Sequence, residues 1–478
     1  MLFNSLNFFF FFILVFFLYW IIPKQKRWIV LLASSYYFYS FWNLGSVFLL
    51  GSVTLLNFIG AIQLEKSKHR KKILLFYLVA SNLALLFVFK YFNFFTHNLN
   101  QLFQLTPTKF NLPTLNLILP IGISFYIFQS LGYLIDVYNQ KISSEKNLGQ
   151  FAFFLSFFPK IIAGPIEKSS HLLPQLKITQ EFSYKNTVSG LQLFTLGLFK
   201  KMVIADNLAL IVNQVFDNLT IYKGFSLVFV LILYSWQIYS DFSGYTDMAR
   251  GLARVFNINL IKNFNHPYLS TSVRDFWRRW HISLSTWLKD YLYIPLGGSR
   301  HGIIKTLTNT LIVFILCGLW HGSSWNFVIW GTLHGVMISF ERLKDYFFKK
   351  RFKIPNFISI IFTYSFITFS WIFFRSETIN DSLYILRNFS LGLKNFLSIS
   401  YISASLTQIF KSNSLEMIIT LSLLFIFIIY EYLSAKFDLV KIFKQQPVFI
   451  RYSIYIITIM AITHLRDANI AKFIYTQF

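Results

Sequence analysis

His321 is the residue of this sequence best suited to acid–base chemistry. It lies inside the apolar region 306–341. An imidazole facing lipid is costly, so the sequence predicts that this ring points to a protein interior or a water-filled cavity. Gly318 and Gly322 flank it and would let another backbone approach closely. A buried structural histidine, satisfied by a neighbouring Ser or carbonyl, is the alternative, and His334 has a weaker case for function.

His281 precedes His321 by 40 residues. The segment 274–291 is expected to form one helix, because its apolar and its charged or hydroxyl side chains separate when projected at about 100° per residue. His281 then falls on the boundary, beside Arg274 and Ser285. An amphipathic helix of this kind suits a membrane interface. A structural interfacial helix whose histidine only hydrogen-bonds a loop is the alternative.

Two such histidines favour acyl transfer. The pKa of histidine is close to physiological pH, so the ring can take a proton from a hydroxyl that attacks a thioester. A pocket that excludes water would suppress hydrolysis of the donor. Cys317 would share a helix face with His321, which makes an acyl-cysteine conceivable. Direct transfer is favoured, because a buried cysteine usually serves packing alone.

Charged, hydroxyl and tryptophan side chains around the two histidines are candidates for lining the donor site or a tunnel. The donor would be a substrate, acetyl-CoA or another acyl thioester, and no permanently bound cofactor is expected. Arg and Lys attract the phosphates that such a donor carries. The sequence contains no His and carboxylate spacing that predicts a metal site. The candidates are Arg274, Arg278, Arg279, Trp280, Ser285, Lys289, Trp320, Trp325 and Asp241.

Three aspartates accompany apolar or aromatic runs, namely Asp136, Asp241 and Asp247. Buried carboxylates need partners. The expected role of each is a structural ion pair, and the candidate partners are Arg250, Arg254, Arg274, Arg278 and Arg279.

The composition predicts the elements that must hold these residues. The 478 residues are 55% hydrophobic and 20% aromatic, more apolar surface than a soluble domain could bury. A span needs roughly 20 apolar residues, and such runs recur along the chain. We expect an all-α polytopic membrane protein with about eleven spans and one integral domain, 1–478. The runs are 5–22 (expected to be retained), 28–63 (two spans), 72–92, 114–138, 150–165, 188–213, 225–245, 306–341, 356–374, 415–434 and 449–465.

The net charge of +25 invites a nucleic-acid partner, but its distribution argues against one. Basic residues gather in short segments between apolar runs, as the positive-inside rule produces. The expected partner is the lipid bilayer, with the amino terminus facing outward. The basic segments are Lys24 to Arg27, 66–72, 344–353 and 436–451.

Residues 241–300 mix charged residues, Gly and Pro with aromatics and are expected to be interfacial or re-entrant, shielded by protein. With the histidine segments, this places the catalytic motifs within 239–335. Several motifs spread along the chain resemble the membrane-bound O-acyltransferase family, in the branch of the alginate and peptidoglycan O-acetylation membrane subunits. They are Leu119-Pro-Ile-Gly-Ile-Ser-Phe-Tyr126, Asp136-Val-Tyr138, Phe158-Pro159, Ala163-Gly-Pro165, Tyr239-Ser-Asp-Phe-Ser-Gly-Tyr245, Arg274-Asp-Phe-Trp-Arg-Arg-Trp-His281, Tyr293-Ile-Pro-Leu-Gly-Gly298 and Gly318-Leu-Trp-His-Gly322.

The resemblance implies a ring of membrane helices with re-entrant elements around a central funnel. It implies that His321 is the catalytic histidine and His281 the second active-site residue. It also implies a bacterial inner-membrane enzyme that moves an acetyl group from a cytoplasmic donor toward an extracytoplasmic polysaccharide, with a periplasmic acetyltransferase partner of the SGNH type. The ending Phe473-Ile-Tyr-Thr-Gln-Phe478 is similar to the branch's ending, except at Thr476.

Two other functions fit the same residues. The first is transfer of D-alanine or another acyl group from a carrier-protein thioester, which the same histidines would serve. The second is transport of a glycan or lipid, because intramembrane Asp, Arg and His also line transport paths. The sequence shows no repeat pair or broken-helix symmetry of the kind that transporters have, so acyl transfer is the preferred interpretation.

Overall fold

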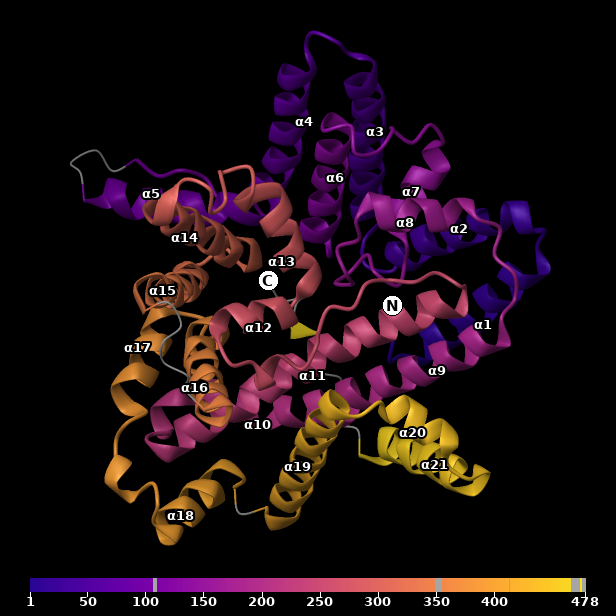
Figure 1. Cartoon of the computed structure of the whole chain (residues 1–478). Coiled ribbons are helices and arrows are strands. Elements are labelled where there is room, and N and C mark those ends of the chain that lie inside the picture. Colours follow the sequence, from indigo (N-terminus) through magenta and orange to yellow (C-terminus); the bar gives the residue numbers. More distant parts are fainter. Residues whose placement is uncertain (106–109, 349–354, 412, 466–472, 475–478) are drawn as a thin grey trace. The chain divides into compact units, whose positions relative to one another are not determined.

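The computed structural model describes residues 1–105, 110–348, 355–411, 413–465 and 473–474 of the chain (Figure 1). The described residues form helices and connecting segments without a β-strand. They divide into two compact units. The first unit holds residues 1–194 and 246–262, and the second holds residues 195–245 and those described from 263 onward.

Six stretches of the described chain are long and apolar enough to cross a membrane. This agrees with the expected all-helical, polytopic class. The ring around a funnel and the single domain stay predictions. The six are α3 (Leu44–Lys66), Lys71–Gln104 with α4 (Lys71–Leu86) and α5 (Phe92–Gln104), α11 (Phe225–Val255), α14 (Gly302–His321), α16 (Asn356–Arg375) and α19 (Ser414–Lys436). Shorter apolar helices are α1 (Leu6–Ile21) and α21 (Val448–His464).

The first unit is held together by buried polar and glycine contacts between its apolar helices. Asn57 on α3 and Asn82 on α4 exchange two side-chain hydrogen bonds of 3.1 and 2.9 Å, and both are fully buried. Near this pair, Gly60 leaves the space that the Leu78 side chain fills. The other helices of this unit are α2 (Arg27–Ser40), α6 (Ile123–Tyr138), α7 (Leu148–Ser156), α8 (Ser169–Lys177), most of α9 (Tyr184–Leu198) and the end of α11.

The second unit contains the candidate site. It includes an antiparallel hairpin of α14 and α15 (Trp325–Phe348) that packs at glycines. A Cβ at Gly318 would stand 2.1 Å from the carbonyl oxygen of Phe327, and one at Gly331 would stand 2.2 Å from that of Phe314. Its other helices, besides α11, α16, α19 and α21, are α10 (Asp206–Phe216), α12 (Val273–Arg279), α13 (Ile282–Leu288), α17 (Ile379–Asn388), α18 (Ile399–Ile409) and α20 (Leu439–Gln445).

Three sequence-based boundaries were wrong. The apolar region 306–341 is two helices, since α14 ends at His321 and α15 begins at Trp325. The run 150–165 contains only the nine-residue α7, about 14 Å long and too short to cross a bilayer. The irregular segment does not begin at residue 241, because α11 continues to Val255. The polar residues that suggested a break have partners, since Tyr239 donates a hydrogen bond to Glu431 and Asp241 pairs with Lys201.

The single helix expected over 274–291 was also wrong. The chain breaks after α12, and His281 adopts a left-handed conformation with φ of 42°. Asn263 explains the break, because its backbone oxygen accepts a hydrogen bond from Ile282 N and its side chain accepts one from Ser283 N. These bonds satisfy the first N–H groups of α13 and start a new helix there.

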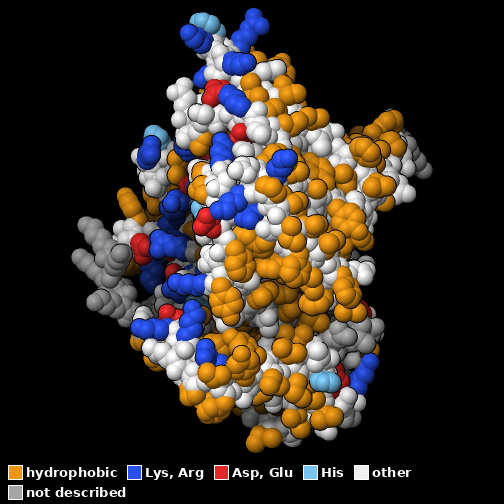
Figure 2. All heavy atoms as spheres, turned by 90° about the vertical axis from the view of Figure 1, so that its right-hand side faces the viewer, with side chains coloured by type: hydrophobic (Ala, Val, Ile, Leu, Met, Phe, Trp, Pro, Cys, Tyr) orange, Lys and Arg blue, Asp and Glu red, His pale blue; other side chains and the backbone are white. Residues whose placement is uncertain are grey.

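Hydrophobic side chains cover most of the face drawn in Figure 2, while Lys and Arg gather along its left edge. Helix α1 is apolar on its exposed side as well as on its buried side, since Phe9, Phe10 and Phe17 are exposed and Phe8 and Phe11 are buried. Exposed apolar side chains on a helix of this kind are stable against lipid and costly against water.

Candidate active site

His321 is the last residue of α14, and its side chain is buried. Aromatic rings surround it: the ring centroids of Trp320, Trp330 and Phe374 lie 5.0, 5.1 and 5.2 Å from that of the imidazole. The chain can turn directly after it because Gly322 has no Cβ, which would otherwise stand 2.0 Å from the Phe327 ring. The predicted close approach of another backbone is confirmed at Gly318, whereas the group that approaches Gly322 is the Phe327 side chain.

His281 comes from the turn between α12 and α13, and its side chain is fully buried. Its ring centroid lies 6.4 Å from that of His321. Trp320 contacts both imidazoles, with centroid distances of 5.8 Å to His281 and 5.0 Å to His321. Phe242 on α11 packs edge-on against His281 at 4.8 Å. The structure therefore brings together the two histidines that the sequence singled out, in an aromatic surrounding.

The left-handed backbone at His281 is a strained feature. A φ of 42° is unfavourable for a residue with a side chain, and such conformations cluster at functional sites. It is maintained by two hydrogen bonds of the peptide group that follows it, from Ser285 N to His281 O and from Ile282 N to Asn263 O. This geometry fixes the direction in which the imidazole leaves the chain.

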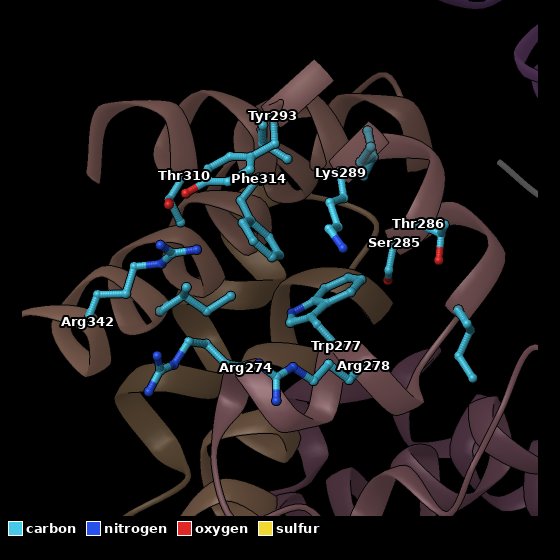
Figure 3. A pocket seen from close by; sticks show the side chains of 14 residues that line it. Arg274, Trp277, Arg278, Ser285, Thr286, Lys289, Tyr293, Thr310, Phe314 and Arg342 are labelled. Atoms are coloured by element: carbon cyan, nitrogen blue, oxygen red, sulfur yellow. The ribbon is translucent and has the colours of Figure 1, made fainter. Parts of the chain in front are cut away.

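A cavity of about 420 Å³ lies beside the same elements (Figure 3). Lys289 points into it from one side and Trp277 forms the opposite wall. Neither histidine lines this cavity, but its lining includes their neighbours in the chain: Ile282 directly follows His281, and Phe314 lies seven residues before His321 on α14. Its lining is Arg274, Trp277, Arg278, Ile282, Ser285, Thr286, Leu288, Lys289, Tyr293, Thr310, Val313, Phe314, Ile338 and Arg342.

The cations of this cavity differ in how they are paired. Arg274 forms ion pairs with Glu341 and Asp345 of α15. Within the described part of the chain, Arg278, Lys289 and Arg342 have no carboxylate at ion-pair distance. These last residues are thus the positive charges that the cavity offers to a ligand.

Arg274 also anchors α12. Glu341 accepts hydrogen bonds from the backbone N–H of Val273 and Arg274, so it caps the first turn of α12. Burial disfavours the charged guanidinium, but the hydrogen bonds and charges of Asp345 and Glu341 outweigh burial and raise the pKa of Arg274. Arg274 therefore stays charged and paired with Glu341 and Asp345.

The remaining donor or tunnel candidates occupy different surroundings. Ser285 lines the cavity, and its hydroxyl donates to the Trp280 carbonyl. Trp280 is fully buried and stacks on Phe276 at 5.3 Å. Arg279 pairs with Asp275 at 3.0 Å. Trp325 is 50% exposed, and it does not line the cavity.

Two of the three aspartates have partners other than the predicted arginines. Asp241 pairs with Lys201 at 2.8 Å and accepts a hydrogen bond from Ile474 N. Asp136 lies 3.6 Å from Lys141. Asp247 pairs with Arg250 at 3.1 Å, as expected. The ion pairing that the sequence predicted for these carboxylates is confirmed by these contacts, while a place for Asp241 in the donor site or tunnel stays a prediction. Tyr475 to Phe478 of the chain's ending lie outside the described residues.

Sequence reasoning missed Arg342 and Trp330. Arg342 follows Ile338 by one helical turn, so the two line the same side of α15, and this spacing was the available signal. Trp330 lies four residues before His334 on the same helix and contacts His321. Neither could be assigned without knowing that α14 and α15 form a hairpin.

Comparison with known proteins identifies the family of this arrangement. The model of MBOAT, the membrane-bound O-acyltransferase family, matches residues 34–376. The chain belongs to this family. As a member it is a multi-pass membrane protein and an acyltransferase, and the transporter alternative is set aside.

Three curated relatives place the chain within the family. It is 37% identical to a peptidoglycan O-acetyltransferase of Helicobacter pylori over 400 residues, 78% of this chain and 75% of the relative. It is 38% identical to a probable alginate O-acetylase, AlgI, of Pseudomonas putida over 352 residues, 72% of this chain and 70% of the relative. A teichoic acid D-alanyltransferase of Bacillus subtilis is 27% identical over 281 residues, 55% of this chain and 71% of the relative.

Proposed function

We propose that this acyltransferase moves an acetyl group from a cytoplasmic thioester toward a cell-envelope polysaccharide, with His321 and His281 as its catalytic pair. The observation that carries the proposal is the meeting of the two buried imidazoles, 6.4 Å apart at their centroids, beside a cationic cavity. In a reacting centre placed between two imidazoles this close together, the attacking hydroxyl can meet one ring and the thioester carbonyl the other.

The transfer step assigns one role to each histidine. His321 takes the proton from the acceptor hydroxyl, or from a relay hydroxyl, as its oxygen attacks the thioester carbonyl. His281 donates a hydrogen bond to the oxygen that becomes negative in the tetrahedral intermediate. The C–S bond then breaks, the proton held by His321 passes to the leaving thiolate, and the new ester remains on the acceptor. The aromatic wall keeps water from the thioester.

Acetyl-CoA is the proposed donor, and the cavity is its proposed entry. Arg278, Lys289 and Arg342 attract the phosphates, while apolar side chains such as Phe314 line the path of the acyl arm. Arg342 precedes the basic segment 344–353, which the positive-inside rule places in the cytoplasm. The same rule supports a bacterial inner-membrane location with the amino terminus outside. Onward delivery uses a periplasmic acetyltransferase partner of the SGNH type.

Cys317 has a smaller part in this proposal. Its side chain is fully buried on α14, one turn before His321. The pair of histidines supports direct transfer, and a covalent acyl-cysteine is not needed for the step. A Cys317→Ala protein that keeps full activity is the expected outcome.

A second candidate function is D-alanyl transfer from a carrier-protein thioester. It is favoured by the similarity to a teichoic acid D-alanyltransferase. The higher identity and wider coverage of the peptidoglycan and alginate O-acetylating relatives favour acetyl transfer.

Inside-out membrane vesicles from the native cells test the donor and its side. Acetyl-CoA labelled in the acetyl group should yield free CoA outside and base-labile label in glycan inside. Vesicles with His321→Ala should accumulate no label, although they contain equal protein. Equal accumulation by both proteins would overturn the proposal. Label incorporated only from D-alanine charged on a carrier protein would select the second candidate.

A further inference from the structure

His334 is a buried histidine that the proposed transfer step does not use. It lies on α15 with a fully buried side chain, and Trp330 contacts both this ring and that of His321. The centroid distance between the rings of His334 and Trp330 is 4.8 Å. His334 also contacts Trp277, which forms part of the cavity wall.

Both nitrogens of His334 have a hydrogen-bond partner. Trp277 Nε1 donates to Nδ1 at 3.1 Å, and Nε2 lies 3.0 Å from the hydroxyl of Ser370. Ser370 donates its own proton to the carbonyl of Ile367 at 2.7 Å. These contacts connect α12, α15 and α16 through one imidazole.

These hydrogen bonds form a series from Trp277 to Ile367, and the groups at its two ends fix the direction of each bond. An indole N–H can only donate, so Nδ1 of His334 must accept and carry no proton. A carbonyl can only accept, so the Ser370 proton points to Ile367, and the hydroxyl oxygen accepts from Nε2–H. His334 is therefore neutral with its proton on Nε2. A second proton on Nδ1 would point at the Trp277 N–H, so two donors would face each other and this hydrogen bond would be lost.

We infer that His334 is a positioning residue that sets the orientation of Trp277, and with it the wall of the donor cavity. It does not act as an acid or base, because both nitrogens are occupied by groups of fixed direction. The inference rests on the proposed function, since the cavity is taken as the donor site. Loss of the Nδ1 acceptor should weaken donor use and leave the chemical step unchanged.

The test measures KM for acetyl-CoA and kcat for CoA release in inside-out vesicles. His334→Leu removes the acceptor and keeps apolar volume, and we expect a rise in KM of about fivefold, the effect of one buried hydrogen bond, with kcat within about twofold. His334→Asn places an amide oxygen near the position of Nδ1, so its KM should stay close to that of the wild type. His97→Leu, at an exposed position on α5, is the matched control.

A double-mutant cycle separates this role from general packing. Trp277→Phe removes the N–H donor and should raise KM on its own, and adding His334→Leu should raise it no further. The inference would be overturned if the KM of the double mutant rose by the product of the two single fold-changes. It would also be overturned if His334→Leu lost much of its kcat with an unchanged KM. Absence of CoA release by the wild type would instead reject the proposed function, so the two failures are distinguishable.

Discussion

The imidazoles of His281 and His321 lie 6.4 Å apart at their centroids although 40 residues separate them in the chain. The two elements that present them are independent: a helix end holds His321, and a left-handed turn holds His281. The Trp320 side chain contacts both rings. Changes at the pair, at Trp320 and at the cavity should therefore have separable effects.

Trp320→Leu should lower kcat on the order of 100-fold, the effect of a small displacement of reacting groups. The smaller side chain leaves both imidazoles without an aromatic ring that contacts them. Trp320→Phe retains an aromatic ring and should keep most of the activity. The measurement is CoA release in vesicles at saturating acetyl-CoA, with Trp42→Leu as the control. An unchanged kcat in Trp320→Leu would show that the shared contact does not position the histidines.

Lys289→Glu should raise the KM for acetyl-CoA about tenfold or more, because it replaces a charge-assisted contact with repulsion in the cavity. The dependence of KM on salt should also become weaker. Lys305→Glu makes the same change in net charge at an exposed position on α14 that does not line the cavity. If both variants raised KM equally, the effect would be general electrostatics, and the cavity would not be the donor site.

Much of the site could be predicted from the sequence because its signals are local. A histidine between glycines in an apolar run, and another among arginines and tryptophans, are unusual in any membrane helix. The chemistry of these residues does not depend on where the helices break. The pairing of His281 with His321 followed from the family resemblance. The structure brings the two rings close together, and their catalytic roles stay predictions.

The parts that failed depend on residues distant in sequence. Residues 274–291 contain no Gly or Pro, so the pattern predicts a continuous helix, and the break at His281 requires Asn263 to cap α13. The partner of Asp241 is Lys201, 40 residues earlier. Which charge a carboxylate meets is set by tertiary packing, and periodicity within one segment does not contain that information.

Gly318→Ala should destabilise the protein by about 1–3 kcal/mol, the usual cost of an overpacked contact. The added methyl group would meet the Phe327 carbonyl at 2.1 Å, and backbone can move only if α14 and α15 separate. Gly51→Ala is the matched control, since a Cβ there meets no atom within 4 Å. Thermal unfolding of the purified proteins in detergent measures the difference. Equal midpoints for the two variants would contradict the tight hairpin.

The Asn57 and Asn82 pair predicts an asymmetry between single and double substitutions. Asn57→Leu leaves the Asn82 amide buried without its partner, so it should lower the unfolding temperature. The double variant, Asn57→Leu with Asn82→Leu, removes both polar groups and should recover part of the loss. Interhelical hydrogen bonds of this kind contribute about 0.6 kcal/mol on average in membranes. Additive losses in the double variant would show that the amides do not act as a pair.

The central claim, that His321 carries acyl transfer to an envelope polysaccharide, is tested most directly by the ester-linked acetate of the cells. Mild base releases this acetate from the polysaccharide of a deletion strain complemented with wild type, His321→Ala or the exposed-site control His97→Ala. The account predicts that the wild type and His97→Ala restore acetate and that His321→Ala does not. Equal restoration by His321→Ala, or acetate that the deletion itself does not change, would contradict it.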